Sequence, residues 1–185
     1  MILSIIVPVY NEENTIIEVL KELNNIKFSK FEKEIIVVDD GSTDNTKDLL
    51  SKNKNLYNFL HINKINQGKG SAIKIGLENS KGVYVVFQDA DLEYDPKDLL
   101  KFEEAFIKFN ADGIIGSRFN YDNYTRSHSI LNKIGNLILT FVFNVFYNTT
   151  FTDIYSCYFA FKKDFINPAN LKVNGFAQHA EILTK

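Results

Sequence analysis

The sequence has little that would support disulfide bonds, nucleic-acid binding or secretion. It contains one cysteine, Cys157, among 185 residues, so no disulfide can form within the chain, and this is compatible with a reducing cytoplasm. The formal net charge is −2 and no run of Lys and Arg occurs, which argues against a nucleic-acid-binding surface. The apolar start at residues 1–3 has no basic residues before it and soon reaches Pro8, so we expect no signal peptide.

The first 120 residues alternate between patterns typical of buried strands and of helices. Strand patterns occur at residues 4–10, 34–38, 56–62, 83–87 and 113–118, and helical patterns lie at about 12–26, 44–53, 73–77 and 95–110. This alternation predicts an α/β fold, with a Rossmann-like, mostly parallel sheet flanked by helices. We expect Asn11 to cap the first helix, Asp95 and Pro96 to begin the last one, and Pro8 to weaken strand pairing locally.

The strand pattern at 83–87 leads into two carboxylates, Asp89 and Asp91, separated by one small residue. Side chains alternate in an extended segment, so both acids can point to the same side. Open α/β sheets bind ligands just outside the carboxyl ends of their strands. Two acids there favour a hard divalent cation with oxygen ligands. The alternative is a polar turn, because Asp is common in loops.

The other predicted strands also end in polar or small residues. Asp39 and Asp40 follow the second strand pattern, and the pattern at 113–118 ends in Arg118. A glycine-containing turn at residues 66–72 leads into a helical pattern, and such a turn lets the backbone approach a phosphate at a helix N-terminus. It matches neither the Walker A loop nor the G-x-G-x-x-G fingerprint.

The last third of the chain contains 19 consecutive residues without a charge, 134–152. Polar residues fall on one helical stripe of this segment, and apolar residues lie largely opposite. The pattern predicts an amphipathic helix and leaves three alternatives: packing on the core of the domain, contact with a membrane interface, or a membrane span. Beyond it, residues 153–161 predict a loop and a strand. The chain stops inside an apparent helix at 180–185, which we interpret as a fragment of a longer protein.

Four motifs in this order resemble family 2 glycosyltransferases of the GT-A fold: VPVYNE at 7–12, VVDDGSTD at 37–44, FQDADLE at 87–93 and GSRF at 116–119. Within that family the chain is most similar to dolichol- or polyprenyl-phosphate mannosyl- and glucosyltransferases, through residues 88–96, 134–136 and 152–158. The resemblance implies one GT-A domain in two parts. Residues 1–120 would bind a nucleotide sugar, and residues 121–185 would form the acceptor and membrane-interface part, with a C-terminal amphipathic helical segment.

The resemblance also implies roles for individual residues. The nucleotide-sugar site is expected to contain Pro8, Tyr10, Glu12, Val38, Asp39, Asp40, Gly68, Lys69, Asp89, Ala90, Asp91 and Arg118. The expected ligands of Mg²⁺ or Mn²⁺ are Asp89, Asp91 and Glu93. The expected catalytic residues are Asp89, Asp91 and Arg118.

The reaction that the resemblance implies is an inverting, metal-dependent transfer of a hexose from a GDP-mannose- or UDP-glucose-type donor to a polyprenyl or dolichyl phosphate. A lipid phosphate is already anionic at neutral pH, so it needs cations to place it rather than a general base. Arg118, with Arg126 or His128, would supply them. The protein would act in the cytoplasm, peripherally at the cytoplasmic face of the membrane, without nucleic acid as a partner.

Two alternatives remain open from the sequence. The first is a family 2 enzyme of cell-surface polysaccharide synthesis that transfers to a saccharide hydroxyl of a glycan acceptor, with Glu181 as a remote candidate base. The second is a truncated fragment that binds a nucleotide sugar without turning it over. A nucleotidyltransferase would need a Gly-rich, basic signature after the first strand, and residues 11–15 contain none.

Overall fold

The computed structural model describes residues 1–117, 130–175 and 177–184. Arg118, Arg126 and His128 lie outside these residues. A six-stranded sheet forms the centre of the molecule, in the order β3-β2-β1-β4-β6-β5. The strands are β1 (Ile2–Val9), β2 (Glu32–Asp39), β3 (Phe59–Ile62), β4 (Tyr84–Phe87), β5 (Gly113–Ile115) and β6 (Phe159–Lys162). Among the described strands, only β6 runs antiparallel to its neighbours, β4 and β5, so the predicted mostly parallel sheet is confirmed.

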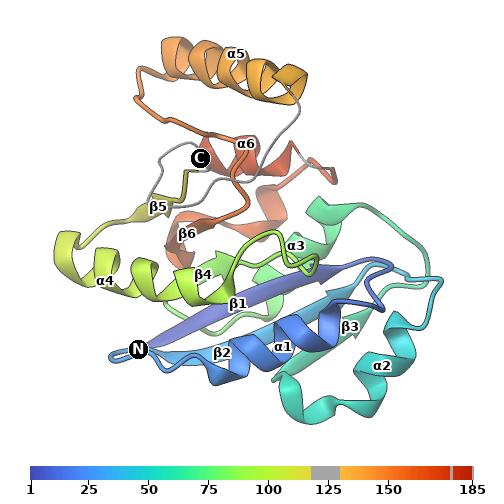
Figure 1. Cartoon of the computed structure of the whole chain (residues 1–185). Helices are drawn as coiled ribbons and strands as arrows, with labels where there is room; N and C mark the ends of the chain where they lie inside the picture. The colour runs from blue at the N-terminus through green and yellow to red at the C-terminus, as the bar shows by residue number, and fades with distance from the viewer. Residues whose placement is uncertain (118–129, 176, 185) are drawn as a thin grey trace.

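Helices cover both faces of this sheet (Figure 1). They are α1 (Ile16–Asn25), α2 (Thr46–Lys52), α3 (Lys69–Asn79), α4 (Leu99–Phe109), α5 (Ile130–Tyr147) and α6 (Gln178–Leu183). Short 3-10 helices lie at Lys54–Leu56, Pro96–Asp98, Lys163–Phe165 and Pro168–Asn170. The expected start of the helix near residue 95 is confirmed, because Asp95 Oδ1 accepts from Lys97 N at 2.9 Å and Pro96 opens the 3-10 turn that continues into α4.

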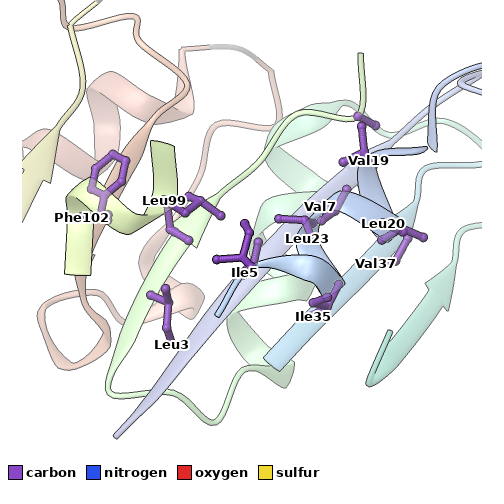
Figure 2. Close-up of a cluster of buried hydrophobic side chains, with 14 of the residues drawn as sticks. Leu3, Ile5, Val7, Val19, Leu20, Leu23, Ile35, Val37, Leu99 and Phe102 are labelled. Carbon is purple, nitrogen blue, oxygen red and sulfur yellow. The ribbon is translucent and has the colours of Figure 1, made fainter. Parts of the chain in front are cut away.

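The alternation of side chains along the strands builds two cores. On one face, Ile5 and Val37 pack with residues of α1 and α4; Figure 2 shows this cluster, with Leu20 and Leu23 of α1 above the strands. On the other face, the strand residues that alternate with those of the first cluster pack with α3 and α6. The apolar strand runs therefore reflect burial on both faces, as in parallel sheets generally. Val83 is the exception: it precedes β4 and is half exposed.

The expectation that Asn11 caps the first helix is wrong. Helix α1 begins at Ile16, with Thr15 in the capping position. Asn11 has a φ of 55°, whereas an N-cap residue normally has extended backbone. Its side chain instead accepts from Thr43 N at 2.8 Å, so Asn11 joins two loops.

The expected weakening of strand pairing at Pro8 is also wrong, since Pro8 pairs with Val38 in the β1–β2 ladder. The carbonyls of Ile2 and Ile6 accept from the β4 side, and that of Val9 accepts from Asp40 N. Alternate residues of a strand bond to opposite neighbours, so the nitrogen of Pro8 faces the β4 side. The ladder between β1 and β4 ends at Ile6, and the missing N–H costs no sheet hydrogen bond.

Helix α5 carries its polar stripe inward. Asn136 Nδ2 donates to Asp153 at 2.8 Å, and Asn144 Nδ2 donates to the Phe151 carbonyl at 2.8 Å. Thr140 is buried beside Asn136. These bonds hold residues 149–154, which follow α5, along the helix. Figure 1 shows α5 apart from the layers around the sheet.

Most of the described apolar side chains of α5 point away from the domain, and Phe143 is buried. Those exposed by more than 40% are Leu131, Ile134, Leu137, Ile138, Leu139, Phe141, Val142, Val145, Phe146 and Tyr147. Packing of this face on the core, one of the three alternatives from the sequence, is therefore wrong. In the described part of the chain, no helix is both long and apolar enough to cross a bilayer.

Glu103 of α4 fixes the loop between α1 and β2. Its buried carboxylate accepts from the backbone N–H groups of Ser29, Lys30 and Phe31 at 2.9, 2.6 and 3.0 Å. Burial alone would raise the pKa of Glu103, but these donors outweigh it and hold the pKa below its ordinary value.

Glu103→Gln is expected to lower the free energy of unfolding by about 2–3 kcal/mol, because the amide loses the charge and turns an NH₂ group toward buried donors. Urea unfolding followed by circular dichroism measures this difference. Because the folded-state pKa of Glu103 is lowered, the stability difference between the parent and Glu103→Gln should have its full size above the unfolded pKa of about 4.3. It should shrink as the pH falls through the folded pKa. The exposed neighbour offers a control: Glu104→Gln should stay within about 0.5 kcal/mol of the parent, and equal losses in both variants would contradict this role.

Candidate active site

The carboxyl ends of the parallel strands β1, β2 and β4 form one edge of the sheet, which we call the rim. The loop after β1 and the loop after β2 are bonded to each other there. Asn11 N donates to Ser42 Oγ at 2.9 Å, and Glu12 N donates to Thr46 Oγ1 at 2.9 Å. Tyr10 projects from the first loop with 44% of its surface exposed, so its ring is available to a ligand at the rim.

Asp39 and Asp40 are both buried at the end of β2, but their oxygens have different surroundings. Asp40 accepts from Asn63 Nδ2 at 2.8 Å, from Gln67 N at 3.0 Å and from Gly68 N at 2.7 Å. Asp39 uses only Oδ1, which accepts from the backbone and side chain of Ser42. Among the described residues, Asp39 Oδ2 has no hydrogen-bond partner. Of the two acids, Asp39 therefore has the buried oxygen, Oδ2, that can accept a hydrogen bond from a ligand.

The start of α3 lies against a segment near the C-terminus, residues 171–175, which we call the strap. Gly70 N donates to the Asn174 carbonyl at 2.7 Å. A Cβ on Gly70 would lie 2.6 Å from the Val173 carbonyl oxygen, and one on Gly68 would lie 2.5 Å from that of Asn174. The glycines thus permit a close backbone approach, but the strap makes that approach in place of the expected phosphate, and the Gly70 amide donates to it.

Lys69, the first residue of α3, turns its ammonium onto the carboxylate of Asp89. Its Nζ also donates to Cys157 Sγ at 3.2 Å. Burial lowers the pKa of Lys69, but Asp89 and Cys157 outweigh it, and the pKa is raised above its ordinary value. Burial, together with the Asp89 charge, raises the pKa of Cys157 to about 12, so the thiol stays protonated at neutral pH.

The segment that follows β4 is held by Gln88 and Tyr158. The hydroxyl of Tyr158 lies 2.9 Å from Gln88 Oε1, and Gln88 Nε2 donates to the Asp89 carbonyl at 3.1 Å. Asp91 is exposed and accepts from Glu93 N at 2.9 Å. Regular strand structure ends at Phe87, so strand alternation does not set the directions of the two aspartates.

The described residues contain no group of three or more His, Cys, Asp or Glu side chains that could hold a metal ion, so the expected set of Asp89, Asp91 and Glu93 does not come together as three ligands. Asp89 already holds a cationic group, the Lys69 ammonium, and Asp91 presents an exposed carboxylate on the same loop. Magnesium is commonly bound by one or two carboxylates, with substrate phosphates and water completing its shell. Asp89 and Asp91 are oxygen donors of the type that such an ion takes.

Most of the predicted site residues therefore lie at the rim. Pro8, Val38 and Ala90 are buried beneath it, and Arg118 lies outside the described residues. Sequence reasoning missed Asn174, Cys157 and Tyr158 as parts of the site. Cys157 and Tyr158 lie in the stretch 152–158 that carries part of the resemblance, but nothing in the sequence assigns them to the rim, because all three residues approach it from distant parts of the chain.

Comparison with known proteins agrees with this arrangement. A model of the family described as "Glycosyl transferase family 2" matches residues 4–167. The dolichol-phosphate mannosyltransferase of Pyrococcus furiosus is 29% identical, with 100% of this chain and 53% of that protein covered. The chain spans about half, or less, of the length of the curated relatives it matches.

Two solved structures share the fold. Glucosyl-3-phosphoglycerate synthase of Mycobacterium tuberculosis, in complex with Mn²⁺, UDP and glucosyl-3-phosphoglycerate, has a TM-score of 0.73 at 19% identity, covering 98% of this chain and 63% of that one. Residues 1–349 of S. aureus TarS in complex with UDP-GlcNAc have a TM-score of 0.64 at 21% identity, covering 98% and 53%. The rim, the mostly parallel sheet and the match over residues 4–167 together show that this chain belongs to glycosyl transferase family 2 and has the GT-A fold.

Proposed function

We propose that this domain transfers a hexose from a nucleotide diphosphate sugar to a polyprenyl or dolichyl phosphate at the cytoplasmic face of a membrane. Family membership supports the nucleotide-sugar half of this proposal. The observation that supports a lipid phosphate acceptor at a membrane is the exposed apolar face of α5. An exposed apolar face of this extent on an amphipathic helix suits a membrane interface.

The state of Glu181 supports a lipid phosphate over a saccharide hydroxyl as acceptor. A hydroxyl acceptor needs a general base, whereas a phosphate is already anionic. The Glu181 carboxylate accepts from the backbone N–H groups of Lys172 and Val173, at 2.9 and 3.0 Å. It thus anchors the strap, and both of its oxygens are engaged by backbone N–H groups.

Within the site, each group has a task that its position allows. Asp39 Oδ2 would accept from an N–H or O–H group of the base or ribose, and Tyr10 would pack beside them. Lys69 would meet the negative charge that develops on the leaving diphosphate. Asp91, with Asp89, would hold Mg²⁺ or Mn²⁺, which when bound supplies Lewis-acid stabilisation of that charge. Arg118, Arg126 and His128 stay the predicted cations for the acceptor phosphate.

Transfer itself tests the proposal. The purified chain, supplied with Mn²⁺, labelled UDP- or GDP-hexose and polyprenyl phosphate in vesicles, is expected to move label into the organic-solvent phase. Heat-inactivated protein and vesicles lacking polyprenyl phosphate are the controls. Label that stays water-soluble in a new glycan would favour the hydroxyl-acceptor alternative, and nucleotide binding without turnover would favour a binding fragment.

Asp39→Asn should weaken binding of the preferred nucleoside diphosphate by roughly 10–100-fold, because an amide removes a charged acceptor worth about 1.5–3 kcal/mol. Isothermal titration with UDP, GDP and CDP measures this effect. CDP tests a contact with the base, since cytosine lacks the ring N–H that uracil and guanine carry: weak CDP binding places the contact on that ring N–H. Asp48→Asn, an exposed acid of α2, is the charge-matched control, and an equal loss in this variant would refute the role of Asp39.

The membrane contact is tested with Phe141→Glu/Phe146→Glu, which removes two side chains that are 68% and 80% exposed. Flotation with phosphatidylcholine vesicles should fall at least about tenfold, because each phenylalanine gains roughly 1.5–3 kcal/mol on leaving water. Phe109→Glu alters an equally exposed phenylalanine on α4 and should float like the parent. Unchanged flotation of the α5 variant would argue against this helix as the contact.

A further inference from the structure

The cation that Asp89 holds in this structure is a side chain of the protein itself. Lys69 and Asp89 form an ion pair in which the two side chains are only 14% and 12% exposed. Cys157 Sγ lies 3.2 Å from the same ammonium. Asp89 is also one of the two carboxylates that we place at the metal site, so a divalent ion and Lys69 would both bind the same carboxylate.

The backbone of Lys69 is held on both sides. If a divalent ion is to replace the Lys69 ammonium at Asp89, the lysine therefore has to leave by a movement of its side chain. Gly68 N donates to Asp40 at 2.7 Å, and Gly70 N donates to Asn174 at 2.7 Å. The carbonyl of Gly70 accepts from Gln178 Nε2 at 2.8 Å. The long, flexible stem of lysine allows its ammonium to move while these bonds remain.

We propose that Lys69 is an internal counter-ion that competes with the divalent cation for Asp89. Without metal, the ammonium neutralises the buried carboxylate, whose isolated charge would be costly. When a divalent cation binds Asp89, repulsion between the two positive groups displaces the ammonium, which then binds the diphosphate of the donor. This inference rests on the proposed function for the identity of that diphosphate, but the competition itself involves only the metal and the protein.

The exchange couples the two ligands. Metal binding alone has to break the ion pair, so the parent protein should bind metal weakly in the absence of nucleotide. A diphosphate gives the displaced ammonium a new partner and should therefore strengthen metal binding, and by linkage metal should strengthen diphosphate binding by the same factor. Removing the lysine should affect the two ligands in opposite directions, which a purely structural role would not produce.

The test is titration with Mn²⁺ alone, followed by the electron paramagnetic resonance of free Mn²⁺, on the parent, Lys69→Met and Lys74→Met. Lys74 lies on the same helix, so its variant removes the same charge nearby. Lys69→Met is expected to bind Mn²⁺ at least tenfold more tightly than the parent and UDP or GDP at least tenfold more weakly, and Lys74→Met is expected to match the parent. Unchanged Mn²⁺ affinity in Lys69→Met, or an equal gain in Lys74→Met, would overturn the proposal.

A second measurement uses the unaltered protein and decides the question even where Lys69→Met fails to fold. Brief acetylation with acetic anhydride, read by peptide mass spectrometry, should modify Lys69 several-fold more when Mg²⁺ alone is added, and Lys74 equally in both conditions. Protection of Lys69 that does not change with Mg²⁺ would overturn the exchange. Both metal experiments need neither donor nor acceptor, so a failed transfer assay would remove the proposed function without deciding the role of Lys69.

Discussion

The arrangement of the rim depends on the buried carboxylate of Asp40. A buried charge is stable only when it is paired or fully hydrogen-bonded, and Asp40 meets that condition by collecting N–H groups from Asn63, Gln67 and Gly68. These bonds tie the end of β2 to the segment that leads into α3. Because Gly68 is fixed in this way, the next residue, Lys69, begins α3 within reach of Asp89. Asp40 thus fixes the position of the segment that leads into α3, and its neighbour Asp39 retains an acceptor for a ligand.

The sheet and the two cores could be predicted from the sequence because they follow from local periodicity. Runs such as Ile35 to Val38 bury both faces, and the patterns between them are helical. Parallel strands then bring their polar ends to one edge whatever the loops do, so Asp39 and Asp89 could be assigned to the rim. The loop conformations depend instead on partners from elsewhere in the chain. Asn11 takes a positive φ and bonds across to Thr43, which no local signal encodes.

The same limit applies to the glycine turn and to α5. The sequence indicated that the glycine turn would let its backbone approach a phosphate, but not that the Gly70 amide donates to the Asn174 carbonyl, 104 positions along the chain. It showed a polar stripe on α5, but hydrophobicity alone suggests that the apolar side faces inward. The structure has the reverse orientation, because Asn136 and Asn144 bond to the returning segment. Specific hydrogen bonding decides which face of this helix is left for a partner.

The position of β6 in the sheet has a consequence for the order of folding. Strand β5 reaches the rest of the sheet only through β6, which lies between β4 and β5. During synthesis β5 therefore leaves the ribosome without a neighbour to pair with, and at about 5–20 residues per second its partner follows only after roughly 2–9 s. Strands β1, β2 and β4 can pair before then, with α1 and α3 on their faces. The β5–β6 side of the sheet is thus assembled last, onto strands β1, β2 and β4 that are already in place.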